Sequence, residues 1–369
     1  MFYPAIKESI MPTRQSFSGK PAHAGIAGIV AAPTAPAVSQ EMGLIKIGHL
    51  GLGSHGSYTG WFANPPAEYK DRVRCRPYAV WDDIPAVADK MKAVMGFEKT
   101  FADPVTLAKE SDVLHIQHAD YRRALEFARP ALEMGKPVFI NRPFTTTIAD
   151  AEEIVRLAKA YNAPLMCSSS REFQPEVDEI KKFAAEKGPI RAHETFCPEQ
   201  HFTWMFPHLF NYACAAFVGG IESAYFTGAY NMDLGKWIDE NLPFACSLSV
   251  LTWKSRGGQP PMIGMHHIGN YSGALHITVY GAKECRDFTV DTKKQYTHMQ
   301  LALNKFYIER TPPTPYDLIL EKHRALAATN ASRLSGQAVR LDSLGGDDEV
   351  PYCQSIRRGV VRSFLKTKS

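Results

Sequence analysis

The first half of the chain alternates short apolar runs with segments in which apolar residues recur every three or four positions. The apolar runs have the length of strands, and the recurring pattern is that of a helix with one buried face. Strands are predicted at residues 44–50, 78–83, 112–117, 137–141 and 164–169, and helices at 84–96, 121–135 and 149–162. Regular alternation of strands and helices predicts a parallel, doubly wound sheet of the α/β class.

Past about residue 185 the pattern becomes that of strands with one buried face. In residues 273–281, Leu275, Ile277 and Val279 alternate with polar or aromatic residues. Further strands are predicted at 190–196, 223–229 and 246–253, and a helix at about 315–335. The parallel sheet is thus expected to occupy residues 44–168. A second α/β domain with a large, mostly antiparallel open sheet is expected at 169–369.

Residues 1–43 do not share either pattern. The apolar stretch at 22–38 is short, rich in alanine and interrupted by Pro33 and Pro36, so we do not expect it to span a membrane. Basic residues before it and small residues after it are typical of an export signal, and a proline-containing arm is the other interpretation. Seven scattered cysteines without CxxC spacing favour a reducing, cytoplasmic location, with export as the alternative.

The charge of the chain argues against one class of partner. Its 42 basic and 38 acidic residues leave a net charge of +4, and they are spread evenly. A nucleic-acid-binding protein concentrates basic residues on one face, so nucleic acid is not an expected partner.

A glycine-rich turn directly follows the first strand. Gly51, Gly53 and Gly56 have the GxGxxG spacing of a dinucleotide-binding turn. The backbone amides around this turn, those of Ser54 and His55 among them, and the start of a following helix would face a pyrophosphate. The motif predicts a Rossmann domain that binds a dinucleotide.

Asp82 closes the second predicted strand, 26 residues after Gly56, near the position at which an acid binds the ribose hydroxyls. An acid there repels a 2'-phosphate, which favours NAD over NADP. NADP stays open as an alternative, because Arg72, Arg74 and Arg76 are close in sequence. Asp82 could also serve as the N-cap of the helix that follows.

The run "ALEMGKPVFINRPFTTTIADAEEIVRLAKAYNAPLMCSSSREFQPEV" (131–177) resembles the region around the Glu-Lys-Pro signature of the glucose-fructose oxidoreductase and inositol dehydrogenase family (Gfo/Idh/MocA). The resemblance extends from Leu44 to about Leu341. It implies a Rossmann domain followed by an α/β domain whose open sheet forms the substrate pocket. It also implies a homo-oligomer, a dimer or a tetramer.

This chain has Asn141, Arg142 and Pro143 where the family has Glu-Lys-Pro. The resemblance places these residues at the nicotinamide and the substrate, where the family's lysine helps to move a proton. An arginine stays protonated and cannot act as a base. We therefore expect Arg142 to contribute to catalysis by holding an oxyanion, a carboxylate or a phosphate.

The family's second domain usually carries an aspartate four residues before a histidine. Here His208 stands at the histidine position and Trp204 at that of the aspartate. His208 is the candidate acid or base, since an unperturbed histidine titrates near neutrality. A histidine that only lines the core or the pocket is the other interpretation.

Three further residues follow predicted strands at the edge where ligands bind. Gln117 and His118 replace a Thr-Pro turn that in the family lies against the nicotinamide, and Arg171 matches an arginine of the pocket floor. No metal site is expected, because the spacing of the nearby histidines matches no familiar ligand pattern: His193, His201 and His208.

The sequence thus favours an NAD-dependent oxidoreductase that acts on a sugar, polyol or cyclitol-like hydroxy compound. Loss of the family's lysine and aspartate supports a second hypothesis, in which the fold serves as a nucleotide-binding sensor or scaffold. A third is a glycosidase or lyase that oxidises its substrate transiently and keeps NAD bound.

Overall fold

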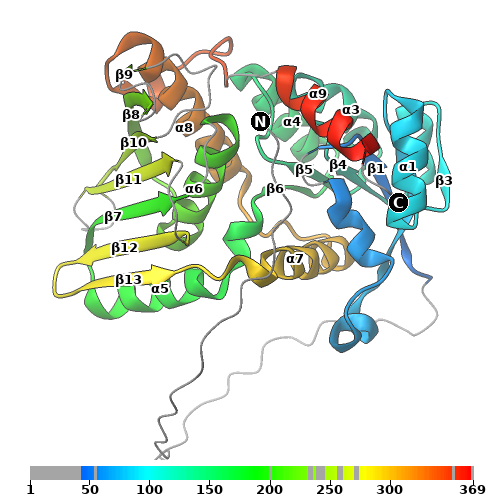
Figure 1. The fold of residues 1–369 in the computed structure, drawn as a ribbon, viewed down its shortest axis with the longest axis horizontal. Helices are drawn as coiled ribbons and strands as arrows, with labels where there is room; N and C mark the ends of the chain where they lie inside the picture. The colour runs from blue at the N-terminus through cyan, green and yellow to red at the C-terminus, as the bar shows by residue number, and fades with distance from the viewer. Residues whose placement is uncertain are drawn as a thin grey trace, which may run out of the picture. The chain divides into compact units, whose positions relative to one another are not determined.

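A six-stranded parallel sheet forms the first part of the fold in the computed structural model (Figure 1). Its strand order is β3-β2-β1-β4-β5-β6, so the direction of winding changes between β1 and β4. This is the doubly wound topology that the alternating pattern predicts, and the fold-class prediction is confirmed. The strands are β1 (Ile45–Leu50), β2 (Cys75–Trp81), β3 (Lys99–Thr100), β4 (Val113–Ile116), β5 (Val138–Asn141) and β6 (Leu165–Ser168).

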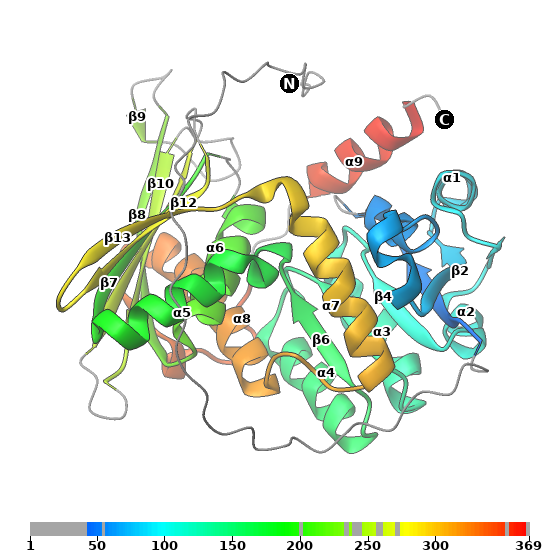
Figure 2. The same cartoon turned by 90° about the horizontal axis from the view of Figure 1, so that it is seen from below.

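Helices cover both faces of this sheet. One face packs against α2 (Pro104–Glu110), α3 (Ala124–Glu133) and α4 (Ile148–Ala160). The other packs against α7 (Gln295–Glu309), which crosses the sheet in Figure 2. Met299 and Leu303 of α7 share a core with Ile47 and Phe139. The core of the first sheet therefore includes a helix from beyond residue 169, which the predicted division of the chain did not foresee.

The second sheet is mixed, with mostly antiparallel neighbours. Its order is β13-β12-β7-β11-β10-β8-β14, β9 pairs with β8, and only the β7–β11 pair is parallel among the described strands. Its strands are β7 (Ile190–Cys197), β8 (Ile221–Asn231), β9 (Lys236–Trp237), β10 (Cys246–Trp253), β11 (Met262–Gly269), β12 (His276–Gly281), β13 (Cys285–Thr289) and β14 (Val339–Arg340). Figure 2 shows α5 (Pro175–Lys187), α6 (Phe202–Phe217) and α8 (Tyr316–Ser335) on the side that faces the first sheet.

Helix α6 was not predicted as a helix. Its sequence, "FTWMFPHLFNYACAAF", is apolar on nearly every side and contains Pro207, so it shows no polar face from which a helical period could be detected. The reason is that most of its side chains are buried between the second sheet and the neighbouring helices. A helix buried on all sides loses the amphipathic signal.

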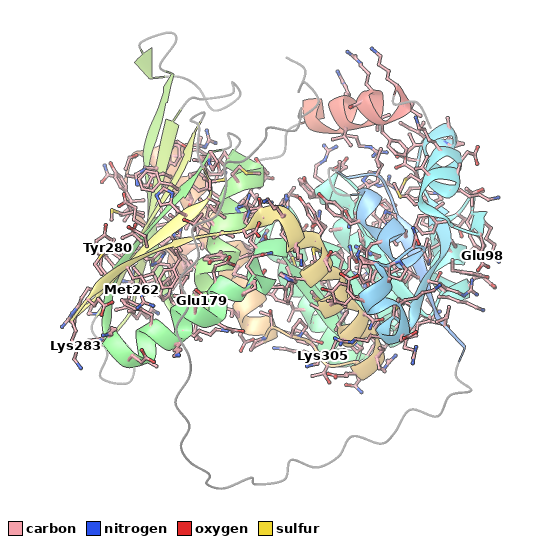
Figure 3. All side chains as sticks on the ribbon, turned by 60° about the horizontal axis from the view of Figure 1, so that its bottom comes forward. Glu98, Glu179, Met262, Tyr280, Lys283 and Lys305 are labelled. Carbon is pink, nitrogen blue, oxygen red and sulfur yellow. The ribbon has the colours of Figure 1, made fainter. Side chains whose placement is uncertain are left out.

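The structure describes residues 43–53, 56–198, 202–231, 236–237, 246–255, 261–269, 274–350 and 354–366. The predictions for residues 1–42, Ser54, His55 and His201 lie outside these ranges, and so does the side chain of Trp204. Figure 3 shows Tyr280 of β12 and Lys283 of the turn after it, well separated from Glu98 of the Rossmann domain and from Lys305 of α7. Within these ranges, no helix combines the length and the apolar character that crossing a membrane requires.

Buried neutral histidines should make the fold sensitive to acid. Burial lowers the pKa of His49 and His323 to about 4 and that of His193 to about 3. Between pH 6.5 and 4 the unfolded chain binds protons that the folded chain does not bind. The free energy of unfolding should therefore decrease as the pH is lowered. Each histidine should contribute about 1.4 kcal/mol per pH unit.

Urea denaturation at several pH values would measure this slope, and the variant His193→Leu should reduce it. A free energy of unfolding that stays constant from pH 6.5 to 4.5 would contradict the prediction.

Candidate active site

The glycine-rich turn lies directly against the end of β4. Gly51 has a φ of +78°, and a Cβ on it would lie 2.4 Å from the ring of His118. A Cβ on Gly53 would lie 2.2 Å from the carbonyl oxygen of Gln117. Both positions therefore exclude any side chain, the first also by its backbone conformation. This close approach occurs where the winding of the sheet changes direction, which is where such sheets bind nucleotides.

The helix expected after the turn is not an α-helix. Gly56 begins a 3₁₀ helix of seven residues, Gly56–Phe62. Gly60 lies inside this segment and Pro65 and Pro66 follow it, and these residue types shorten or end helices. The helix that follows the turn is therefore a short 3₁₀ helix, and the alignment of its start with a pyrophosphate stays a prediction.

A chain of buried hydrogen bonds joins the two strands beneath the turn. Gln117 Nε2 lies 2.8 Å from His115 Nε2, and Thr59 Oγ1 lies 3.2 Å from His115 Nδ1 and 2.8 Å from His49 Nδ1. His49 Nε2 lies 3.0 Å from the carbonyl oxygen of Gly51. This chain ties the glycine turn to the end of β4.

The donor and acceptor of every hydrogen bond in this series follow from the carbonyl group of Gly51. Burial lowers the pKa of His49 to about 4 and that of His115 well below 6.5, so both rings are neutral and each has one donor and one acceptor. Because the Gly51 oxygen can only accept, His49 Nε2 donates to it and His49 Nδ1 accepts from Thr59. Thr59 then accepts from His115 Nδ1, and His115 Nε2 accepts from the amide of Gln117.

The chain leaves the acceptor oxygen of Gln117 available. Gln117 is 2% exposed, and within the described ranges its Oε1 has no hydrogen-bond partner. A buried carbonyl oxygen without a donor is costly, so it fits a site in which a bound molecule supplies the donor. The glycine turn and Gln117 together fit a dinucleotide, whose hydroxyl and carboxamide groups are such donors.

Asp82 lies at the same edge but is already fully engaged. Its Oδ2 accepts from the amide of Leu52 at 2.8 Å, and its Oδ1 accepts from the amide of Ile84 at 3.0 Å and from Arg357 Nη2 at 2.9 Å. Asp82 is not the N-cap of α1 (Pro85–Met95), because Ile84 holds that position. Sequence reasoning found the acid and missed the arginine that pairs with it.

The three arginines on which the NADP alternative depends lie near the start of β2, whereas a cofactor would bind at its carboxyl end. Arg72 and Arg74 precede the strand and Arg76 is its second residue, whereas Asp82 follows its last residue. At about 3.3 Å per residue, some 20 Å of strand separates Arg76 from Asp82. Arg76 instead pairs with Glu98. These arginines therefore give no support to NADP.

Arg142 and His208 are brought together although 66 residues separate them. Arg142 Nη2 donates to His208 Nε2 at 2.5 Å, and His208 Nδ1 lies 2.5 Å from Ser169 Oγ. A nitrogen that accepts from a guanidinium carries a lone pair, so His208 is neutral and its proton is on Nδ1, which donates to Ser169. The structure thus holds the histidine in the tautomer whose Nε2 can accept a proton.

Burial and the neighbouring tyrosines shift the pKa of Arg142 in opposite directions. Burial lowers the pKa of its guanidinium, and Tyr121, Tyr296 and Tyr58 oppose that shift, while Arg171 adds to it. Arginine remains protonated despite such shifts. Arg171, predicted on the pocket floor, is buried in the short helix that follows β6 and is close enough to affect Arg142 electrostatically.

A buried ion pair supports the serine that orients His208. Ser169 donates its amide to Glu172 Oε1 at 2.8 Å, and Glu172 pairs with Lys322 Nζ at 3.2 Å. Burial raises the pKa of Glu172, and Lys322 opposes the shift. Sequence reasoning missed these residues, although Ser169 and Glu172 have the S-x-x-E spacing of a capping box, which they form.

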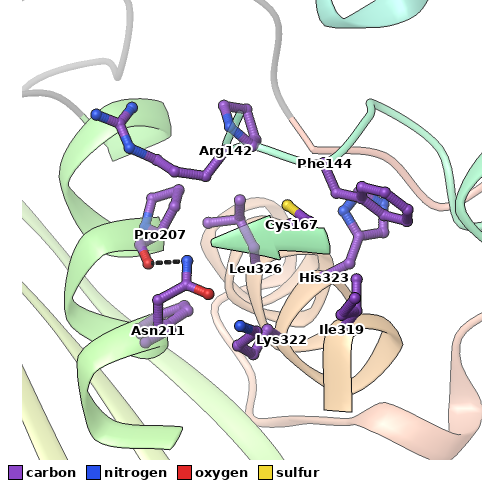
Figure 4. A pocket seen from close by; sticks show the side chains of 11 residues that line it. Arg142, Phe144, Cys167, Pro207, Asn211, Ile319, Lys322, His323 and Leu326 are labelled. Carbon is purple, nitrogen blue, oxygen red and sulfur yellow. Dashed lines mark hydrogen bonds between the residues drawn. The ribbon is translucent and has the colours of Figure 1, made fainter. Parts of the chain in front are cut away.

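The space beside Arg142 is small. Arg142, Cys167, Asn211 and Lys322 are among the residues that line a cavity of about 20 Å³ between β5, β6, α6 and α8 (Figure 4). This volume holds about one water molecule. A second, smaller cavity is lined by His118 and Asn141, among others. In this conformation neither cavity has room for a sugar.

The predicted residues thus form two groups. Gly51, Gly53, Asp82, Gln117 and His118 meet at the ends of β1, β2 and β4. Asn141, Arg142, Arg171 and His208 meet at the ends of β5 and β6 and on α6. Within the described ranges, the one cluster of possible metal ligands is Asp82, Asp83 and His118.

Residues 45–169 match the family of oxidoreductases with an NAD-binding Rossmann fold that is named GFO_IDH_MocA. This domain belongs to the Gfo/Idh/MocA family. The resemblance found in residues 131–177 is confirmed, and so is the expectation of an NAD-binding family.

Similar proteins are found among known sequences and among solved structures. The Escherichia coli (strain K12) protein "Uncharacterized oxidoreductase YhhX" is 37% identical over 90 residues, which are 24% of this chain and a quarter (25%) of that protein's length. A probable dehydrogenase from Thermotoga maritima has a TM-score of 0.68 at 17% identity, over 82% of this chain and 100% of that one.

Scyllo-inositol dehydrogenase from Lactobacillus casei, solved with NAD(H) and scyllo-inositol, has a TM-score of 0.66 at 14% identity, over 81% of this chain and 99% of that one. At these identities the structural likeness shows a shared fold over both sheets and does not establish the substrate.

Proposed function

We propose that this protein is an NAD-dependent oxidoreductase that acts on a hydroxyl group of a sugar, polyol or cyclitol-like compound. The observation that carries the proposal is the contact of Arg142 with the neutral His208, held by Ser169, on a Rossmann domain of this family. The structural neighbours include scyllo-inositol and myo-inositol dehydrogenases, which supports a polyol as the class of substrate. NAD, when bound, would supply the hydride acceptor.

The residues of this chain divide the remaining tasks. His208 Nε2 would accept the proton of the substrate hydroxyl, because its lone pair is the basic site of the ring. For the hydroxyl to reach it, Arg142 must release its bond to Nε2. The guanidinium then lies beside the developing oxyanion and stabilises its negative charge, which is a role that a fixed cation can fill.

Gln117, the glycine turn and the edge of the sheet would hold the dinucleotide. A hydroxyl or carboxamide group of the bound dinucleotide would donate to Gln117 Oε1. The hydrogen bond to His115 sets the orientation of the Gln117 amide. We keep NAD as the preferred cofactor, since Asp82 stands where a 2'-phosphate would bind. We also propose a cytoplasmic homo-oligomer, for which the exposed Tyr225 and Ile263 on the open face of the second sheet offer an apolar contact.

A second candidate function has an observation of its own. Arg142 already occupies the lone pair of His208, and the cavity beside the pair holds about one water molecule. A site closed in this way fits a nucleotide-binding sensor that does not turn over substrate.

The variant Arg142→Lys separates the two functions. Purified wild-type and variant protein would be incubated with NAD and a panel of sugars, polyols and cyclitols while the absorbance of reduced nicotinamide is followed. For an oxidoreductase we expect turnover by the wild type and a kcat changed by at least about tenfold in the variant, because a lysine cannot reproduce the planar guanidinium.

The control is Arg191→Lys, an exposed arginine of β7, which should behave as the wild type does. Binding of NAD with no turnover by either protein on the whole panel would contradict the oxidoreductase and favour the sensor.

A further inference from the structure

The C-terminal helix α9 (Gln354–Lys366) docks on the Rossmann domain beside α1 (Figures 1 and 3). Val360, Val361 and Phe364 pack against the apolar cluster that joins α1 to β2 and to Leu52 of the glycine turn. Lys90 of α1 donates to the carbonyl oxygen of Leu365 at 3.3 Å and lies 5.3 Å from the centre of the Phe364 ring. The apolar side of α9 therefore holds the helix on the nucleotide-binding edge of the sheet.

Arg357 extends from α9 to the tip of β2. Its Nη2 donates to Asp82 Oδ1 at 2.9 Å and also pairs with Asp83, while its Nη1 donates to the carbonyl oxygen of Leu52 at 3.3 Å. The side chain of Arg357 is 12% exposed, and that of Asp82 is 0% exposed. A single guanidinium thus covers the acid and bonds to the glycine turn at the same time.

These contacts leave no free acceptor position on Asp82 Oδ1. A carboxylate oxygen accepts about two hydrogen bonds. Asp82 Oδ1 already has two donors, Ile84 and Arg357, and Oδ2 faces the amide of Leu52. Of these donors, the backbone amides belong to the glycine turn (Leu52) and to the connection between β2 and α1 (Ile84), and only Arg357 is a side chain that can leave without moving the backbone. Because the Asp82 side chain is 0% exposed with Arg357 in place, a ribose hydroxyl that bonds to either oxygen must take the place of Arg357.

We propose that α9, through Arg357, occupies the adenosine-ribose position of the nucleotide site and competes with the dinucleotide for Asp82. This inference depends on the proposed NAD-binding function. Competition of this kind lowers the apparent affinity by the fraction of molecules in which the site is open. Anything that weakens the docking of α9 then strengthens dinucleotide binding without a new contact to the ligand.

Titration calorimetry of the full chain tests the proposal, with NAD and ADP-ribose as the two ligands. Arg357→Ala removes the group that covers Asp82, and Phe364→Ala weakens the docking from the opposite side of the helix. Both variants should bind both ligands at least about tenfold more tightly than the wild type, since a site open in a tenth of the molecules gains tenfold when it opens fully.

The control is Arg358→Ala, which removes the same charge from an exposed position of the same helix and should leave both affinities unchanged. Amide hydrogen exchange gives an independent readout, because saturating NAD should increase the exchange of residues 357–366 in the wild type.

Equal or weaker binding by Arg357→Ala and Phe364→Ala, with NAD binding by the wild type intact, would overturn the competition and leave the proposed function standing. If neither the wild type nor any folded variant bound NAD or ADP-ribose, both the proposed function and the proposed competition would be wrong. Circular dichroism of each variant establishes that it is folded.

Discussion

Replacing His208 with asparagine should lower kcat by about 10²- to 10⁴-fold, the usual contribution of a positioned general base. Asparagine retains an amide that can donate to Ser169 Oγ and a carbonyl oxygen that can accept from Arg142, so the local packing should survive. It has no nitrogen that can accept a proton. The affinity for NAD should stay within a few-fold of that of the wild type, because His208 lies on α6, away from the glycine turn.

Steady-state kinetics on the best substrate of the panel, together with NAD titration, would measure both effects. His276→Asn, at a half-buried position of the second sheet, is the matched control and should leave kcat unchanged. A kcat for His208→Asn close to the wild-type value would mean that this histidine only lines the site, which is the alternative that the sequence left open.

Replacing Gly53 with alanine should abolish dinucleotide binding and destabilise the fold by about 1–3 kcal/mol, the usual cost of forcing extra volume into a packed site. The new Cβ would lie 2.2 Å from the carbonyl oxygen of Gln117. That oxygen belongs to the backbone and cannot turn aside, so the turn and the end of β4 must separate. The same movement displaces Gln117 and breaks its bond to His115.

The control is Gly43→Ala, just before β1, where an added Cβ has no atom within 4 Å. Urea denaturation and NAD titration of the two variants give the comparison. Unaltered NAD affinity in Gly53→Ala would show that the turn does not carry the nucleotide, and the proposed cofactor site would have to lie elsewhere.

The local features of this protein could be read from its sequence. The period of apolar residues identified five of the six strands of the parallel sheet and helices α1, α3 and α4, because that period is set by the geometry of each element alone. The two-residue strand β3 and the seven-residue helix α2 were not predicted, because elements this short show no period. The ends of elements were less certain: β2 begins at Cys75, three residues before the predicted strand. The glycines of the turn were also found, since a positive φ and a close backbone approach each require glycine locally.

Residues that act through distant partners could not be assigned in the same way. The pairing of His208 with Arg142 spans 66 positions and that of Asp82 with Arg357 spans 275. No periodicity links such residues, and an arginine on a terminal helix has the same sequence signature whether it meets solvent or an acid. Only the packing of α9 against α1 identifies the partner.

The sequence by itself therefore determined the Rossmann sheet, the glycine turn, the family of the first domain and the identity of most candidate site residues. The tertiary structure decided that α7 completes the core of the first sheet, that Arg142 donates to Nε2 of His208, and that Arg357 covers Asp82. The physical reason is one of range. Backbone geometry and apolar period act between neighbours along the chain, whereas the charge partner of a buried group is set by which surfaces meet after folding.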